Sequence, residues 1–141
     1  MRAVWLALGV VLLAGAKGEA GEIVAGPGAF LGASAQAEER ALRKVLEGYV
    51  RAIEDKDVEL FRTVKPNLSA DEERRARKAF ESLQSQAIVM TIQSAEVQAS
   101  QATVKVSRRD TINKSIVSSF PQAFTLEKAK DGWTIREIGS R

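Results

Sequence analysis

Four carboxylates lie close together in the sequence, at Glu54, Asp55, Asp57 and Glu59. Clustered carboxylates can hold a divalent cation or form a proton-transfer pair. A calcium loop places oxygen ligands at alternating positions, with a glycine at the turn and a distal glutamate, and that pattern does not follow here. The alternative is that these acids end one helix and begin the next, with Asp57 as the N-cap. We expect this second role and predict no metal site.

A second candidate is the pair Arg108 and Asp110, which continues the alternation of Ala102, Val104 and Val106. Residues two apart in a strand face the same side, so both side chains extend this apolar face toward a pocket or its rim. A general base at neutral pH needs a pKa raised by desolvation, whereas a neighbouring guanidinium lowers the pKa of a carboxylate. The pair therefore suits a structural ion pair, or contact with an anionic ligand, better than proton abstraction.

Three more polar side chains share faces with apolar residues. Tyr49 lies on the apolar stripe of a predicted helix, where a core aromatic is the commoner role than a hydrogen bond to a substrate. Ser118 and Gln122 alternate with Phe120 and Phe124, and they would supply polar points in an apolar cavity. The predicted ligand-binding residues are Tyr49, Arg108, Asp110, Ser118 and Gln122. No catalytic residue is predicted, unless the domain is an enzyme, in which case Asp110 and Tyr49 are the candidates.

The composition removes several chemistries. The chain of 141 residues has no histidine and no cysteine, and its net charge is +3. It therefore lacks the usual neutral-pH base, the commonest metal ligand, and any thiolate or disulfide. The charge is too small to imply nucleic acid or an anionic membrane. The basic run Arg74–Lys78 has no interleaved aromatic residue, so we expect a solvated helix face there, and we predict no cofactor and no nucleic acid.

The first twenty residues, MRAVWLALGVVLLAGAKGEA, have one basic residue, an apolar run and then small residues. The run from Ala3 to Ala16 is shorter than the roughly 20 residues that span a bilayer, and it is typical of a signal peptide. We predict a signal peptide over residues 1–20 with an ambiguous cleavage site, and export to the periplasm or extracellular space. No stable membrane span is expected after its removal. Residues 21–37 are rich in Gly and Ala and are predicted to be a linker.

The elements that position the candidate side chains begin at Glu38. Apolar residues at helical spacing predict a long first helix (Leu42, Val45, Leu46, Tyr49, Val50, Ile53). A short second helix would begin at Asp57 and end before Pro66, because the residue preceding a proline is disfavoured in helical geometry. The sequence Ser69-Ala70-Asp71-Glu72 has the form of a capping box and predicts a third helix. Its expected apolar face consists of Ala76, Ala79, Phe80 and Leu83.

After Ser85 the apolar period falls from 3.6 to 2 residues. Four strands follow, separated by short turns at ASQ, INKS and KAKDG that suit hairpins. Pro121 indicates an edge or a bulge in the third strand, and the change of parity before Ile138 indicates a bulge in the last. Helices followed by strands predict an α+β domain over residues 38–141, with three helices packed on a curved antiparallel four-stranded sheet.

The stretches LRKVLEGYVRAIEDKDVELF, ATVKVSRRDT and DGWTIREI, in this order, resemble the nuclear transport factor 2-like superfamily and, within it, the SnoaL-like domains. The resemblance covers residues 38–141. It implies a cone-like fold, in which a bent sheet wraps around the first helix and leaves a pocket, and dimers that form through the sheet. Members include steroid isomerases, polyketide cyclases, dehydratases, epoxide hydrolases and non-catalytic binding domains, so the fold alone fixes no function. Catalytic relatives commonly use a histidine, which this chain lacks.

We therefore expect an exported, non-catalytic ligand-binding or protein-interaction domain that takes a small hydrophobic or anionic ligand and forms a homodimer through the sheet. The alternative is a small-molecule isomerase, cyclase or dehydratase that uses a pocket carboxylate. An Asp110 enclosed in an apolar pocket without contact to Arg108 would favour the enzyme. A third hypothesis, a pure dimerisation domain, predicts an interior filled by side chains such as Phe120, Phe124 and Trp133.

Overall fold

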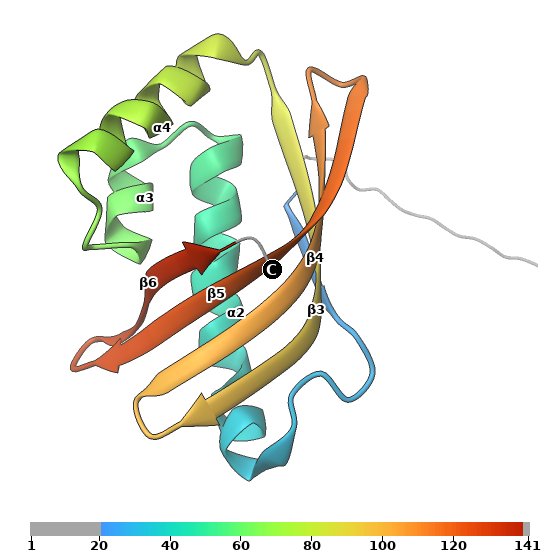
Figure 1. Cartoon of the computed structure of the whole chain (residues 1–141), viewed down its shortest axis with the longest axis vertical. Helices are drawn as coiled ribbons and strands as arrows, with labels where there is room; N and C mark the ends of the chain where they lie inside the picture. Colours follow the sequence, from blue (N-terminus) through green and yellow to red (C-terminus); the bar gives the residue numbers. More distant parts are fainter. Residues whose placement is uncertain (1–20, 140–141) are drawn as a thin grey trace, which may run out of the picture.

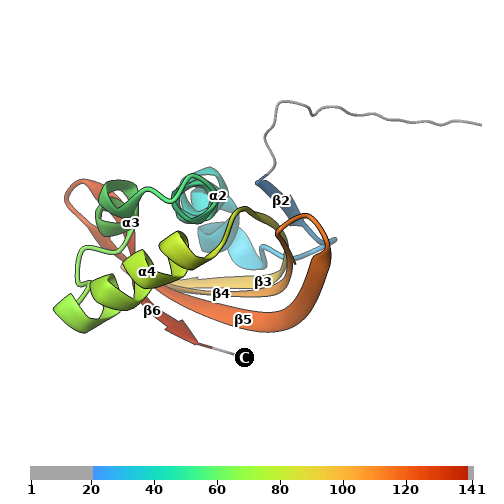
Figure 2. The same cartoon turned by 90° about the horizontal axis from the view of Figure 1, so that it is seen from above.

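The computed structural model describes residues 21–139, so the predicted signal peptide over residues 1–20 lies outside the described residues. The elements are β2 (Glu22–Ala25), α2 (Gly32–Glu54), α3 (Val58–Val64), α4 (Ala70–Ser82), β3 (Gln86–Gln98), β4 (Gln101–Ile112), β5 (Ile116–Ala129) and β6 (Gly132–Gly139). The three helices lie on one side of a bent sheet (Figures 1 and 2). In this part of the chain, no helix is long and apolar enough to cross a bilayer.

Within residues 21–139 the sheet contains five strands in the order β2-β3-β4-β5-β6, so the prediction of four strands is wrong by one. The additional strand, β2, pairs in parallel with residues 89–92 of β3, and the other neighbours are antiparallel. Residues 21–37 are therefore not a plain linker, and α2 begins at Gly32 rather than near residue 38. The physical reason is that Ile23 buries its side chain in the core. This tertiary contact cannot be predicted from the sequence of a strand of four residues.

Helix α2 provides the core of the cone. Its predicted apolar stripe is confirmed, because Leu42, Leu46, Tyr49, Val50 and Ile53 are all buried. Figure 2 shows α2 lying in the hollow of the sheet. The opposing strand residues are also buried and follow the predicted alternation (Ile88, Met90, Ile92, Ala102, Val104, Val106, Phe124, Leu126).

The predicted starts of the second and third helices are confirmed by their caps. The Asp57 carboxylate accepts a hydrogen bond from Leu60 N at 3.1 Å and begins α3. Ser69 and Glu72 form both hydrogen bonds of the capping box at the start of α4, at 3.1 and 3.0 Å. Helix α3 ends at Val64, shortly before the proline.

Helix α4 packs more loosely than its sequence predicts. Of its residues only Phe80 is buried, Ala76 is half-buried and Ala79 is exposed. Apart from Phe80, the apolar residues on this face of α4 are alanines, whose short side chains do not become buried. A groove therefore remains between α4 and the sheet.

Two bulges shape the sheet. In the β5–β6 pair, Thr125 lies opposite Glu137 and Leu126 lies opposite Ile135, which leaves Arg136 as the extra residue and confirms the predicted bulge. The other irregularity falls between Ile92 and Ser94 in the β3–β4 pair.

Candidate functional site

The predicted pair of Arg108 and Asp110 forms a buried, two-pronged ion pair on β4. Arg108 Nε donates to Asp110 Oδ1 at 2.6 Å, and Arg108 Nη2 donates to Asp110 Oδ2 at 2.8 Å. Only 6% of Arg108 and 3% of Asp110 are exposed. The two residues lie on the same face of the strand, and the planar guanidinium fits the carboxylate with two parallel hydrogen bonds.

Two of the other predicted site residues complete the coordination of the guanidinium. Arg108 Nη1 donates to the hydroxyl of Tyr49 at 2.9 Å and to Oε1 of Gln122 at 3.0 Å. Tyr49 comes from α2 and Gln122 from β5, so this single side chain links three elements. The guanidinium uses four of its five N–H groups in these contacts.

Gln86 belongs to the same cluster and was missed from the sequence. Its Nε2 donates to Asp110 Oδ2 at 2.8 Å. The signal was present, because Gln86 shares the parity of Ile88, Met90 and Ile92 and therefore faces the core side of β3. We use the name Arg108 cluster for Tyr49, Gln86, Arg108, Asp110 and Gln122.

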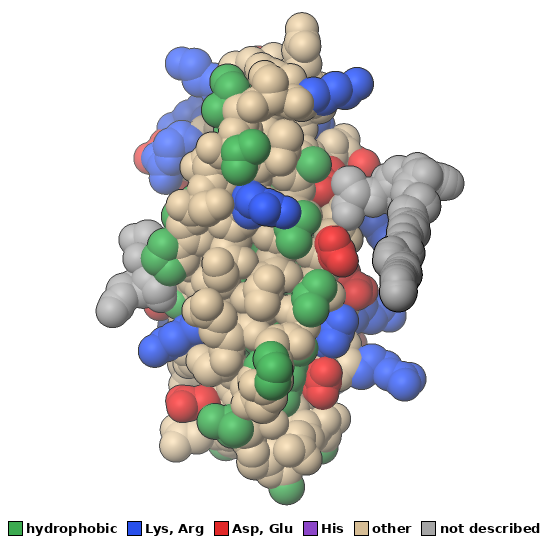
Figure 3. All heavy atoms as spheres, turned by 90° about the vertical axis from the view of Figure 1, so that its right-hand side faces the viewer, with side chains coloured by type: hydrophobic (Ala, Val, Ile, Leu, Met, Phe, Trp, Pro, Cys, Tyr) green, Lys and Arg blue, Asp and Glu red, His purple; other side chains and the backbone are tan. Residues whose placement is uncertain are grey.

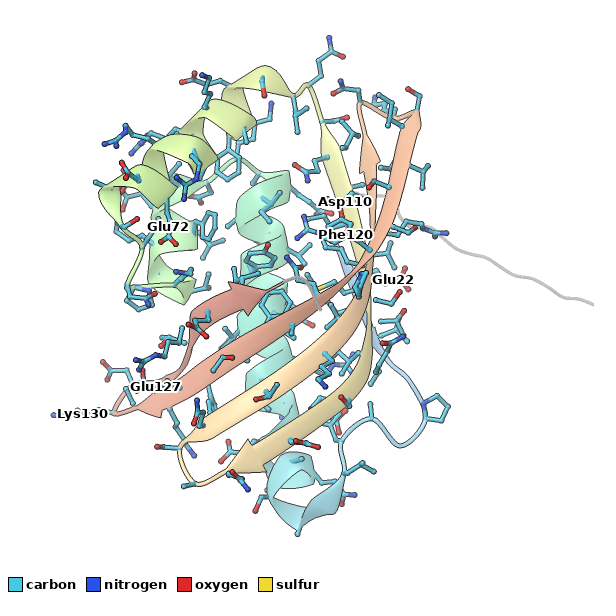
Figure 4. All side chains as sticks on the ribbon, viewed as in Figure 1. Glu22, Glu72, Asp110, Phe120, Glu127 and Lys130 are labelled. Carbon is cyan, nitrogen blue, oxygen red and sulfur yellow. The ribbon has the colours of Figure 1, made fainter. Side chains whose placement is uncertain are left out.

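The electrostatics of the cluster keep Arg108 charged. Burial acts to lower the pKa of Arg108, but its hydrogen bonds to Asp110 and the interaction with the Tyr49 phenol outweigh it, so the pKa is raised above its ordinary value. The guanidinium also lies 5.1 Å from the centroid of the Phe120 ring and 5.7 Å from that of Tyr49, within the range of cation–π attraction. Figure 4 shows Asp110 and Phe120 near one another at this end of the sheet.

Aromatic rings close the cluster on its other sides. The ring of Tyr49 packs edge-on against Phe61 of α3, with centroids 5.8 Å apart, and against Phe124 of β5, at 5.2 Å. Phe61 in turn contacts Phe80 of α4, at 6.4 Å. The polar groups thus make hydrogen bonds with one another inside an apolar shell, which is the arrangement expected of a stabilising core network.

Ser118 is not part of this cluster. It lies opposite Asp110 in the register of β4 and β5, yet its side chain is exposed. The parity inferred from the sequence is correct, but the hairpin extends beyond the core at this point, and Ile116 and Val117 are exposed there too.

The acidic cluster around residue 55 separates into different structural roles. Asp57 caps α3, and Asp55 is the C-cap of α2. The Glu54 carboxylate accepts hydrogen bonds from Ile88 N at 2.8 Å and Gly21 N at 2.9 Å, and so ties the end of α2 to β3. These acids therefore take part in capping and tethering.

Trp133 lies in the core, as predicted, and its indole N–H reaches the rim. Trp133 Nε1 donates to Glu38 at 2.9 Å, and Lys128 Nζ donates to the same carboxylate at 2.7 Å. The hydrogen bonds from Lys128 and then Trp133 lower the pKa of Glu38. The arrangement links the start of the domain to the β5–β6 hairpin.

Solved structures of similar shape share little sequence with this chain. Kfla4162 from Kribbella flavida aligns over 75% of this chain and 90% of its own length, with a TM-score of 0.67 and 12% identity. Rv3472 from Mycobacterium tuberculosis, a protein of unknown function, aligns over 75% and 76%, with a TM-score of 0.67 and 15% identity. A protein of the NTF2-like family from Streptomyces avermitilis aligns over 74% and 95%, with a TM-score of 0.60 and 12% identity. No protein-family model and no curated protein matches the sequence.

Proposed function

We propose, from the premise that this chain has the nuclear transport factor 2-like fold, that it is an exported, non-catalytic binding or interaction domain. In this proposal the Arg108 cluster holds the interior of the cone together and does not act on a substrate. The leader-like first twenty residues support the location, and the absence of histidine from the sequence supports the lack of acid–base chemistry.

The observation that carries the proposal is that both oxygens of the Asp110 carboxylate already accept hydrogen bonds from neighbouring side chains. Its two oxygens accept three hydrogen bonds, two from Arg108 and one from Gln86. A general base must reach the proton that it abstracts, at about 2.6–3.2 Å. Arg108 and Gln86 already lie within that distance of the Asp110 oxygens, at 2.6–2.8 Å. Asp110, the best candidate base of the enzyme alternative, is therefore engaged by other side chains.

The sheet offers a face for a second copy of the chain. In the strand register, Val24, Thr91, Ser107 and Pro121 form one row of neighbouring residues across four strands, and none of them is charged. Val24 and Val117 are large hydrophobic residues that remain exposed. Figure 3 shows this side of the molecule, with uncharged and scattered hydrophobic side chains in the middle and charged ones mainly toward the margins. We propose that this face forms a homodimer.

Nuclear magnetic resonance with ¹⁵N-labelled protein and a library of small fragments tests the non-catalytic proposal. Fragments should shift resonances of surface residues and leave the Arg108 Nε–H resonance unchanged. A fragment that binds in the cone and shifts the Arg108 Nε–H resonance would show that the cluster contacts ligands, and would overturn its purely structural role in this proposal.

Light scattering tests the dimer. A Ser107→Arg substitution places a charge in this uncharged row, between the exposed Lys105 and Arg109 of the same strand, and should convert the dimer into a monomer, because charged residues are depleted from interface cores. The matched control is Ser100→Arg at the exposed β3–β4 turn, which should remain dimeric. A wild-type protein that is monomeric at all concentrations tested would contradict the dimer.

A further inference from the structure

The groove beneath α4 is a second site, separate from the Arg108 cluster. Its volume is about 960 Å³, and it lies between α3, α4 and the adjoining parts of β5 and β6. None of the five residues of the Arg108 cluster lines it. Phe61 separates the two, since one side of its ring contacts Tyr49 while the residue also lines the groove.

The most unusual residue of the groove is Lys65, which is only 7% exposed. A buried ammonium group is unfavourable unless hydrogen bonds and opposite charge compensate it. Lys65 Nζ lies 3.2 Å from Asn67 Oδ1 and 3.4 Å from Glu72 Oε1. Both distances are long for a charged donor, and the same Glu72 oxygen also accepts the capping hydrogen bond from Ser69 N at 3.0 Å. Two of the three N–H groups of the Lys65 ammonium therefore have an acceptor within residues 21–139, and both of these hydrogen bonds are weak.

Two arginines extend the positive charge along the rim. Arg75 lines the groove, is exposed, and makes no hydrogen bond or ion pair with any residue in the described part of the chain. Arg136 is the residue that the β6 bulge leaves unmatched, and bulges commonly redirect a side chain toward a site. Its one ion pair within the described range is the exposed contact with Glu127 at 3.4 Å.

The acids of the groove do not balance these cations. Glu72 and Glu137 line it as well, so the lining carries three cations and two carboxylates, while Glu127, outside the lining, pairs with Arg136. Glu72 is committed to the capping box, and its hydrogen bond with the Ser69 backbone contributes most to the lowering of its pKa. The lining residues therefore carry one more positive than negative charge, which suits an anionic ligand.

The rest of the lining is apolar. Phe61, Leu68, Ala76, Ala123 and Ile138 line the groove. Each of these five side chains is only partly buried, so the apolar surface is incompletely covered. An apolar ligand body would complete the packing of α4, which contributes just Phe80 to the core.

We propose that this groove binds an amphipathic monocarboxylate, with the carboxylate at Lys65, Arg75 and Arg136 and the hydrocarbon against Phe61 and Ile138. The inference rests on the proposed function and names its ligand class. The volume lies at the upper end of the roughly 300–1,000 Å³ found for small-molecule sites, so a chain of about ten carbons fits.

Sodium decanoate is the probe, with isothermal titration calorimetry for affinity and ¹⁵N resonance shifts for location. Decanoate should bind, shift resonances of α4 and β6, and bind more weakly as salt is added. Decanol, which has the same chain without the charge, should bind about tenfold more weakly, because it loses the charge-assisted hydrogen bonds.

Two variants locate the charge contacts. Lys65→Met should weaken decanoate binding about tenfold or more, since its ammonium is buried, and Arg75→Gln should weaken it about threefold, since its guanidinium is exposed. The matched control is Lys78→Gln on the same helix, which removes the same charge outside the groove and should leave the affinity unchanged. Arg75 is exposed, so its variant remains informative if Lys65→Met fails to fold.

The outcomes separate this inference from the proposed function. Equal binding of decanoate and decanol, equal effects of Arg75→Gln and Lys78→Gln, or no binding at all would overturn the carboxylate site. Each of these results leaves the Arg108 cluster closed and the proposed function intact. Decanoate that shifts the Arg108 Nε–H resonance instead would overturn both.

Discussion

Replacing Arg108 by methionine should destabilise the domain strongly. The substitution removes the two hydrogen bonds that Asp110 accepts from Arg108. Asp110, which is 3% exposed in the native structure, then keeps Gln86 as its remaining donor. The substitution also removes the donor to Tyr49 and Gln122. Breaking a buried pair by removing one partner costs about 3–5 kcal/mol. That loss is a large share of the roughly 5–15 kcal/mol of a typical domain, and it corresponds to a fall of about 10–20 °C in Tm.

Urea denaturation followed by circular dichroism measures the effect. The matched control is Arg74→Met, since Arg74 pairs with Asp71 on the surface and 70% of its side chain is exposed. That variant should change the free energy of unfolding by less than about 0.5 kcal/mol. The double variant Arg108→Met/Asp110→Leu should recover most of the loss, because no buried charge then remains unpaired.

Two results would refute this reasoning. A loss below about 1 kcal/mol for Arg108→Met would mean that water reaches the carboxylate and that the cluster is open. A double variant as unstable as the single variant would mean that the loss comes from packing and not from the unpaired charge of Asp110.

Three further predictions follow from local features. Asn113 and Lys114 both have positive φ in the β4–β5 turn, so Lys114→Gly should raise the free energy of unfolding by about 0.5–1 kcal/mol in urea denaturation, and a loss would contradict the turn geometry. A hydrogen bond with the Ser69 backbone lowers the pKa of Glu72 below 4.5, and a hydrogen bond with Arg62 lowers that of Glu73. The two carboxylates therefore stabilise the fold above pH 4.5, and this stabilisation is lost as the pH falls through their lowered pKa values. Tm should therefore drop on acidification from about pH 5 to about pH 3, and an equally steep drop in Glu72→Gln would exclude Glu72 as a cause. Phe80→Ala should cost about 2–4 kcal/mol and speed amide exchange in α4 more than in α2, because Phe80 is the one buried side chain of α4; uniform exchange would contradict the loose packing of that helix.

Local chemistry explains why much of the fold could be predicted from the sequence. The stripe of α2, the Asp57 cap and the Ser69–Glu72 capping box depend on spacings of three or four residues that the sequence displays directly. The bulge at Arg136 was visible in the change of parity, and the common face of Arg108 and Asp110 follows from the two-residue period of a strand.

The features that escaped prediction depend on tertiary contacts. Strand β2 is four residues long. It forms because its backbone pairs with the edge of β3 and because the side chain of Ile23 packs in the core. Ser118 has the correct parity but lies beyond the core, and parity alone does not say how far a sheet extends past its helices. Lys65 is buried in a groove that it lines together with residues of α4 and β6, and the sequence around it does not signal that burial.

The central claim, that the Arg108 cluster is a closed structural network, is tested most directly by the hydrogen-exchange rate of the Arg108 Nε–H group at neutral pH. In ¹⁵N-arginine-labelled protein, this group should give a separate resonance and exchange far more slowly with water than the Nε–H of exposed Arg74, because it donates at 2.6 Å to a buried carboxylate. Exchange of Arg108 as fast as that of Arg74 would show a cluster open to solvent, and would contradict the account.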